Sequence, residues 1–264
     1  IRATRLESSK AEINGSVHSE VTTSASTNGG GSATANAKAV RPDPSLTFGA
    51  EKIGVDVDRT NSKGTAKVNG LVNSSFDVDA NNIHGAATAT TQEQQVTGVL
   101  GTDLIAKGAI DVDGTATVIQ DAKASTHGGG NATANVISGP NFGTGLDASG
   151  GQLALDGVTG IAYTGNIHGQ STVDLDGIVS YTGAATAQNT TGTATANVGT
   201  GGQPLQDMVG TLLVPPHNVN SNGDMTIKGQ ATAMTTSSAT THSGAATAGI
   251  NSDPVKGVKS KGGI

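Results

Sequence analysis

Residues 26–37 read STNGGGSATANA, and residues 125–136 read STHGGGNATANV. The two segments are identical at nine of twelve positions and start 99 residues apart. A shorter copy, Gly229-Gln-Ala-Thr-Ala, follows at the same interval, and Gly85-Ala-Ala-Thr-Ala has a match that begins at Gly183. Self-similarity at a fixed interval is typical of repeat proteins, and we infer a superrepeat of about 98 residues.

The superrepeat predicts how the chain is organised. Lys256, Lys259 and Lys261 stand among glycines after the last repeated segment, and such a stretch is typical of a mobile terminus. We therefore expect a first superrepeat over 1–111, a second over 112–210, a partial third over 211–252 and a flexible Lys/Gly tail over 253–264.

Within the repeats, small apolar residues alternate with polar ones. Ala33, Ala35 and Ala37, for example, alternate with Thr34 and Asn36. Successive side chains of a β-strand point to opposite faces, so this alternation predicts strands with one apolar and one polar face. No long stretch shows the three- and four-residue spacing of an amphipathic helix. The sequence therefore predicts an all-β fold of short strands, arranged as a β-solenoid or a stacked β-sandwich.

Two-residue segments that end in glycine mark the expected turns between these strands. Glycine after Asn or Asp is a strong turn signal, because it supplies the positive φ that tight turns need. We expect turns at Asn14-Gly15, Asn28-Gly29, Asn69-Gly70, Asp113-Gly114, His127-Gly128, Asp156-Gly157 and Asn222-Gly223.

The composition excludes several classes of function. The chain has no Cys, 2% aromatic residues and a formal net charge of −6. The lack of Cys excludes disulfide scaffolds and thiolate metal sites. Scarce aromatic residues and negative charge argue against a nucleic-acid partner, and no apolar run approaches the length of a membrane span. The chain starts with Ile1 rather than Met, which we interpret as processing, and we expect a secreted, extracellular protein.

Threonine recurs on the polar faces of the expected strands. If these strands stack in register, the Thr side chains form a grid with spacings of about 6.7 Å along a strand and about 4.8 Å between strands. The segments Gly114-Thr-Ala-Thr, Gly192-Thr-Ala-Thr and Gly85-Ala-Ala-Thr-Ala-Thr resemble the longhorn-beetle type of hyperactive antifreeze protein. That resemblance implies a flat β-solenoid that binds ice through rows of Thr.

The candidate ice-binding or surface array contains the Thr residues at these alternating positions. The other interpretation is that Thr simply occupies solvent-facing positions of strands. The array comprises Thr34, Thr88, Thr90, Thr115, Thr117, Thr133, Thr186, Thr193, Thr195, Thr232 and Thr247.

Aspartates also occur at alternate positions, which places both carboxylates of a pair on one face of a strand. Stacked carboxylates repel each other, so they favour a bridging cation, of which calcium is the candidate, or lysine partners. The other interpretation is solubilising charge on exposed strands, with no cofactor. The candidate residues are Asp56, Asp58, Asp77, Asp79, Asp111, Asp113, Asp174 and Asp176.

The sequence shows no nucleophile elbow, phosphate-binding glycine loop or histidine metal signature, and we expect no enzymatic activity. The bias towards Ser, Thr, Gly and Ala resembles silk-associated and adhesive or cement proteins of invertebrates. We therefore expect a secreted structural protein of an extracellular filament, silk or adhesive. It would assemble with itself or with other structural proteins through β-strand edges. The alternatives are an ice-binding protein with a flat Thr-rich face, and an adhesin that binds a cation or a carbohydrate.

Overall fold

The computed structural model describes residues 1–3, 5–38, 52–93, 95–138, 157–199, 208–213, 218–252 and 255–260. Within these residues the regular structure consists of β-strands, and all the strand pairs are parallel. The all-β prediction is therefore confirmed. In the part of the chain that the structure describes, no helix is long and apolar enough to cross a membrane.

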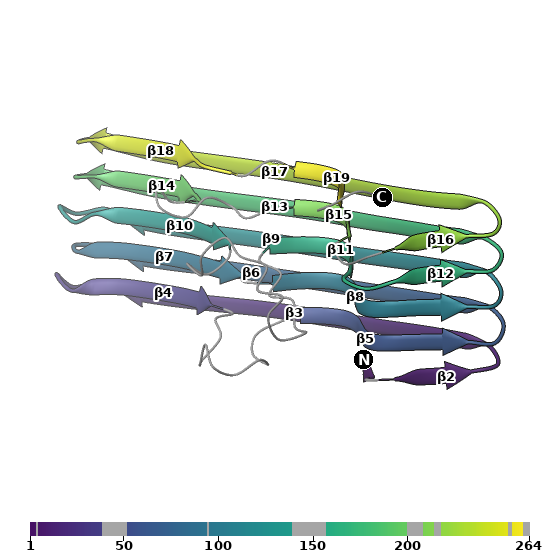
Figure 1. Ribbon diagram of the computed structural model, residues 1–264. Coiled ribbons are helices and arrows are strands. Elements are labelled where there is room, and N and C mark those ends of the chain that lie inside the picture. Colours follow the sequence, from purple (N-terminus) through teal and green to yellow (C-terminus); the bar gives the residue numbers. More distant parts are fainter. Residues whose placement is uncertain are drawn as a thin grey trace.

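The strands form one nine-stranded sheet and two five-stranded sheets, which we call sheets A, B and C (Figure 1). Sheet A contains β1 (Arg2–Ala3), β2 (Leu6–Ser8), β5 (Lys52–Ser62), β8 (Gln95–Ala106), β11 (Gly157–Tyr163), β12 (Ile167–Gly169), β15 (Met208–Leu213), β16 (Val219–Ser221) and β19 (Val255–Ser260). Sheet B contains β3 (Ala11–Thr27), β6 (Ala66–Asn82), β9 (Ile110–Thr126), β13 (Val173–Thr191) and β17 (Met225–Ser243). Sheet C contains β4 (Ser32–Lys38), β7 (Ala86–Glu93), β10 (Ala132–Ser138), β14 (Ala194–Val198) and β18 (Ala246–Ile250).

The chain visits the three sheets in the order A, B, C and then begins again, and we call one such visit a pass. Each strand pairs with its counterparts in the passes before and after it. Figure 1 shows the passes as successive rows from β3 to β17. Residues at equivalent positions consequently stack into columns across the sheets. The first column of sheet B, for example, contains Ala11, Ala66, Ile110, Val173 and Met225.

Two hydrophobic clusters divide the interior between the sheets. The strands of sheet B are 17 to 19 residues long and therefore span both clusters. Their first halves pack against sheet A, as Val68 does against Val99 in one cluster. Their second halves pack against sheet C, as Val78 does with Ala89 in the other. Sheet B thus forms one layer, and sheets A and C share the second.

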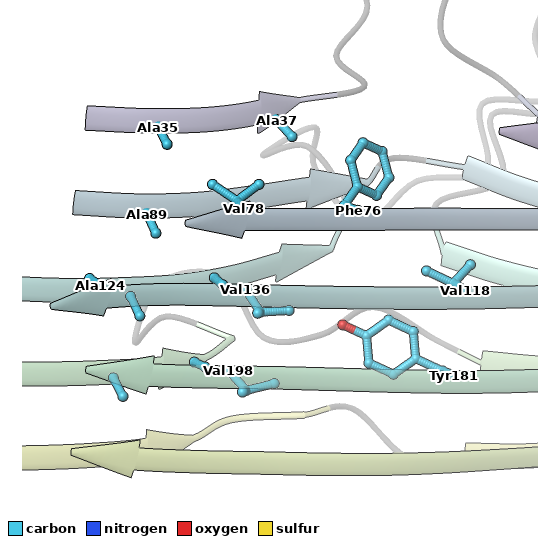
Figure 2. Packing of buried hydrophobic residues seen from close by; sticks show 14 of the residues in the cluster. Ala35, Ala37, Phe76, Val78, Ala89, Val118, Ala124, Val136, Tyr181 and Val198 are labelled. Atoms are coloured by element: carbon cyan, nitrogen blue, oxygen red, sulfur yellow. The ribbon is translucent and has the colours of Figure 1, made fainter. Parts of the chain in front are cut away.

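The interior between sheets B and C is built mostly from alanine and valine. Figure 2 shows Ala89 of sheet C beside Val78 of sheet B, and the rings of Phe76 and Tyr181 lie further along the strands of sheet B. Alanine is small, so each such residue contributes far less than the ~1.5–3 kcal/mol of a buried Val or Leu. The backbone hydrogen bonds between passes must therefore carry a large share of the stability.

Several of the expected glycine turns are wrong. Asn14-Gly15, Asn69-Gly70 and Asp113-Gly114 lie inside the long strands of sheet B, and the structure assigns positive φ to none of these glycines. They belong to one column of sheet B, the glycine column, because the backbone of sheet A approaches closely there. The column contains Gly15, Gly70, Gly114, Gly177 and Gly229. A Cβ atom on Gly70 would lie 1.9 Å from the carbonyl oxygen of Gly98. The chain bends at Asn28, His127 and Asn222 as expected, but the glycines that follow them do not have the expected positive φ. Asp156 lies outside the described residues.

The 99-residue interval corresponds to two passes. Ala33 pairs with Ala87, and Ala87 pairs with Ala132. The segments at 26–37 and 125–136 therefore occupy the same place two passes apart. The other two matches are not structurally equivalent. Gly229 and Gly183 lie inside strands of sheet B, whereas Gly31 and Gly85 lie at the corner before sheet C. Short Ala/Thr segments therefore recur in both sheet B and sheet C, and the unit that repeats in the structure is one pass.

The corner between sheets B and C explains why alternate passes are more alike in sequence. Its buried column contains Thr27, Asn82, Thr126, Asn189 and Thr241. Each later member donates a side-chain hydrogen bond to a glycine carbonyl of the preceding pass. The bonds are Asn82 Nδ2 to Gly31 O, Thr126 Oγ1 to Gly85 O, Asn189 Nδ2 to Gly130 O and Thr241 Oγ1 to Gly192 O, at 2.7, 2.8, 2.7 and 3.2 Å.

The expected domain boundaries fall inside strands. The boundary at 111/112 lies within β9 and the boundary at 210/211 within β15, while the division into superrepeats itself stays a prediction. The segment expected to be a flexible tail contains β19, which pairs with β15. The physical reason is that Val255–Ser260 extends the backbone ladder of sheet A and Gly257 packs against Gly229.

The glycine columns give a first prediction. We expect Gly70→Ala to lower the free energy of unfolding by about 1–3 kcal/mol, because the added methyl group forces two backbones apart. Gly29→Ala is the matched control, because a Cβ atom at Gly29 meets nothing within 4 Å. Urea unfolding followed by circular dichroism measures both variants. Equal stability of the two would contradict the close approach of sheets A and B.

The corner column gives a second prediction. The Asn82 side chain donates to Gly31 O and Ala86 O and accepts from the backbone N–H groups of His84 and Gly85. We expect Asn82→Ala to cost about 1–3 kcal/mol of unfolding free energy, because buried backbone groups lose their partners. Asn81→Ala, at the exposed neighbouring position, is the control and should change stability by less than about 0.5 kcal/mol.

Candidate functional surfaces

The outer face of sheet C carries a continuous threonine column. One Thr from each pass pairs in register, and the column consists of Thr34, Thr88, Thr133, Thr195 and Thr247. The neighbouring column on this side of sheet C contains Asn36, Thr90, Asn135, Asn197 and Gly249, of which Thr90 is buried. Asn197 Nδ2 donates to Asn135 Oδ1 at 3.2 Å, so the amides themselves form part of a ladder. Sheet C therefore brings together six members of the candidate Thr array.

The remaining members of that array lie elsewhere. Thr193 stands at the corner before β14 and donates from Oγ1 to Asn131 Oδ1 at 2.7 Å. The others are on sheet B, whose outer face points away from that of sheet C because the two sheets pack through their inner faces. There they pair with residues of other kinds. Thr115 pairs with Leu71 and Ile178, and Thr117 pairs with Asn73. Thr186 pairs with Lys123, and Thr232 pairs with Ser180.

The candidate aspartates divide among three places. Asp111 and Asp113 of β9 pair in register with Asp174 and Asp176 of β13 on the outer face of sheet B. Lys67 of β6 approaches this group, with Nζ 2.8 Å from Asp111 Oδ2. Burial and then the neighbouring Asp111 raise the pKa of Asp113, whereas the hydrogen bond to Asp111 raises the pKa of Lys67.

The other two aspartate pairs lie away from this group. Asp77 and Asp79 are further along sheet B, where Lys123 Nζ lies 3.6 Å from Asp77 Oδ1 and 2.6 Å from Asp121 Oδ2. Asp56 and Asp58 belong to β5 in sheet A. The described residues contain no group of three or more His, Asp or Glu side chains that could hold a metal ion. On sheet B, lysine partners thus accompany the stacked carboxylates.

A shallow groove crosses the outer face of sheet B above the glycine column. It has a volume of about 390 Å³. Amides, hydroxyls, one carboxylate and one aliphatic side chain line it, and Asn69 Nδ2 donates to Asn14 Oδ1 at 2.6 Å along its floor. The lining side chains are those of Asn14, Ser16, Asn69, Leu71, Asp113 and Thr115.

A buried polar cluster lies where sheet A gives way to sheet C. Lys52 Nζ is 2.7 Å from Glu93 Oε2 and 2.6 Å from Ser74 Oγ, and it lies 4.4 Å from the centre of the Phe76 ring. Glu93 is 1% exposed. Sequence reasoning missed this cluster, because Lys52, Ser74 and Glu93 come from three different sheets and no motif links them.

A second buried polar contact lies close to the first. Tyr181 donates its hydroxyl to Gln120 Oε1 at 2.8 Å, and Gln120 Nε2 donates to the carbonyl oxygen of Ile137 at 3.1 Å. Burial raises the pKa of Tyr181 strongly, and the negative charge of Glu93 raises it further. With Ser74 and Glu93 almost inaccessible, this arrangement suits a structural role rather than contact with a substrate.

The last candidate surfaces are the edges of the sheets. Within the described residues, β3 and β17 are the outermost strands of sheet B, and β4 and β18 are the outermost strands of sheet C. Each has strand neighbours on one side, so a row of backbone N–H and C=O groups faces outward along the other side. At 17 and 19 residues, β3 and β17 are long for edge strands, which natural proteins usually keep short.

No protein family, curated protein or solved structure matches the chain.

The buried ion pair gives a third prediction. We expect Glu93→Ala to lower the free energy of unfolding by about 3 kcal/mol, because Lys52 is left poorly paired in a mostly buried position. The double variant Lys52→Met with Glu93→Leu should recover most of this loss. Glu7→Ala, which breaks the exposed pair with Arg5, is the control and should cost less than about 1 kcal/mol. Thermal and urea unfolding of the unmodified protein and the three variants measures these differences in stability.

Proposed function

We propose that the protein is a non-enzymatic structural β-solenoid whose copies assemble end to end into an extracellular filament, silk or adhesive. The joint forms by parallel strand pairing, in which β17 and β18 of one copy meet β3 and β4 of the next. The observation that carries the proposal is that the columns shared by all five passes begin at β3 and β4 and end at β17 and β18, which are the outermost strands of sheets B and C in the described residues.

The glycine column sets the register of the proposed joint in sheet B. It runs through Gly15, Gly70, Gly114, Gly177 and Gly229, so the next glycine along the stack is Gly15 of the following copy. In this register Ile227 meets Ile13 and Ala239 meets Ala25. At another inward position Ser237 meets Thr23, in the column where the inner passes have Val78, Ala122 and Ala185.

Sheet C continues in the same way. Ala246, Thr247 and Ala248 of β18 occupy the columns that contain Ala33, Thr34 and Ala35 of β4. The threonine column therefore extends from one copy into the next. Because sheets B and C give matching joints independently, a single rigid placement of two copies satisfies both.

The charges at the joint are also compatible. Within β17 the outward charged side chain is Lys228, and in the proposed register it lies one diagonal step from Glu12 of β3. Within one copy, Lys123 and Asp77 stand in a diagonal relation across two strands, with Nζ 3.6 Å from Oδ1. Adjacent oppositely charged side chains stabilise paired strands, so the joint gains a cross-strand ion pair and opposes no like charges.

Pairing of the edges would cover the long exposed edge strands of the free molecule. Long flat edge strands are templates for adding another chain, and parallel addition gains main-chain hydrogen bonds along the whole edge. Between sheets B and C, where the interior consists mostly of small residues, these bonds are an important source of cohesion. The proposal thus uses between copies the interaction that holds each copy together.

A second candidate function is ice binding, which the threonine column on sheet C favours. In this case the column would present one hydroxyl and one methyl group every ~4.8 Å along the stack. The function would then depend on Thr133 and Thr195 in the middle of the column and would need no joint between copies.

The fourth prediction tests the joint in sheet B. The chain has no Cys, so Ser16→Cys with Gln230→Cys introduces the sole thiols. The two positions lie at opposite ends of the stack within one copy but ~4.8 Å apart across the joint, which suits a disulfide. We expect oxidation to give a ladder of covalent oligomers, and negative-stain electron microscopy to show filaments that grow with concentration.

The control pairs Gln230→Cys with Ser24→Cys, which is eight residues, or ~26 Å, out of register. It should give no ladder. Monomers at every concentration, together with inhibition of ice recrystallisation that Thr133→Leu and Thr195→Leu remove, would overturn the structural proposal in favour of ice binding.

A further inference from the structure

We propose that the joint between copies is a lap joint, in which β19 of one copy displaces β1 of the next and pairs with β5. This inference rests on the proposed end-to-end assembly. It assigns a function to the segment 255–260 and an autoprotective role to residues 1–3.

The lap arises because sheet A is displaced by one pass relative to sheet B. A Cβ atom on Gly15 would lie 2.2 Å from Gly54 O, and one on Gly229 would lie 1.9 Å from Gly257 O. Each glycine of sheet B thus packs against a glycine of sheet A from the following pass. The five strands of sheet B are therefore matched by β5, β8, β11, β15 and β19, and not by β1.

At the end of the stack formed by β17, β19 projects beyond the last complete pass. It pairs with β15 through Met208–Val255 and Thr211–Val258, and it is the outermost strand of sheet A there. Val255 and Val258 are 41% and 42% exposed, so β19 presents apolar side chains as well as a backbone edge.

At the opposite end of the stack, β1 lies beside the first part of β5. β1 pairs with β5 only through Arg2–Asp56 and Ala3–Val57. The amino group of Ile1 donates to Gly54 O at 2.8 Å, and Asp56 N donates to Ile1 O at 2.8 Å. The described residues place no strand beside Lys52 and Ile53 on this side of β5.

β19 fits the same edge of β5. The columns of sheet A place Val255 in the column of Lys52 and Val258 in the column of Val55. When sheet B continues from β17 to β3 of the next copy, the same step brings β5 of that copy next to β19. Val258 then meets Val55 of the next copy and joins two stretches of the buried column of Val55, Val99, Ile161 and Thr211.

The last residues of β19 compete with β1. Lys259 and Ser260 lie in the columns of Asp56 and Val57, which are the register partners of Arg2 and Ala3. Both strands cannot occupy these positions, so joining requires β1 to leave. The six residues of β19 thus lie in the columns of Lys52 to Val57, and Lys259 is in the column of Asp56. β2 is unaffected, because Leu6–Ser8 lies further along β5.

The exchange has a consequence for how assembly is controlled. β1 blocks part of the docking edge in the free molecule, so addition of each copy is opposed until β1 detaches. The lap also makes the joint unidirectional, because the end with β19 complements only the end with β5.

The fifth prediction locks β1 in place with a disulfide. Ala3→Cys with Val57→Cys joins register partners on neighbouring strands, whose Cα separation of ~4.8 Å suits a disulfide. We expect the oxidised protein to lose filament growth, as followed by light scattering and electron microscopy, and the reduced form of the same protein to regain it. Growth at the same rate in both redox states would overturn the exchange.

A second pair of cysteines traps the joint itself. Val55→Cys with Val258→Cys should give an intermolecular disulfide ladder, whereas Val99→Cys with Val258→Cys, one pass further along, should not. If the Ser16/Gln230 cysteine pair cross-links and the Val55/Val258 pair does not, end-to-end assembly holds and the lap joint is wrong. If neither pair cross-links and no filaments form, the proposed assembly itself is wrong.

Discussion

The in-register parallel pairing of successive passes is the interaction on which the rest of the structure depends. The interior between sheets B and C is largely alanine, and such small side chains bury little apolar surface per residue. Backbone hydrogen bonds along strands of 17 to 19 residues supply cohesion that side-chain burial cannot. At the corner, Asn82 and Asn189 extend the same ladder with their side chains.

The glycine columns determine which register is adopted. Sheets A and B approach so closely that a methyl group at Gly70 would overlap the backbone of Gly98, so glycine must stand at this position in every pass. A slip by one residue would put a larger side chain there and turn the apolar face outward. Because the register is held in this way, Thr88 stacks on Thr133, and Lys67 meets Asp111.

The same columns link the fold to the proposed assembly. The spacing that repeats between passes also holds between the last pass of one copy and the first pass of another, so a joint needs no new kind of contact. The displacement of sheet A by one pass turns that joint into a lap, with Gly257 covering Gly229 and β19 projecting towards the next copy. In this joint β19 takes the positions beside β5 that β1 occupies in the single copy.

The alternation of Ala33, Ala35 and Ala37 with polar residues was sufficient to predict strands, their inner faces and the all-β class, because side-chain direction along a strand is a local property. The change of direction at Asn28 could also be predicted, because the glycines that follow it are a local sequence signal. Asn69-Gly70 carries the same local signal but lies inside a strand, because the backbone of Gly98 packs against it. The pass length, the Lys52–Glu93 pair and the displacement of sheet A likewise depend on which distant residues face one another, and only the tertiary structure decided them.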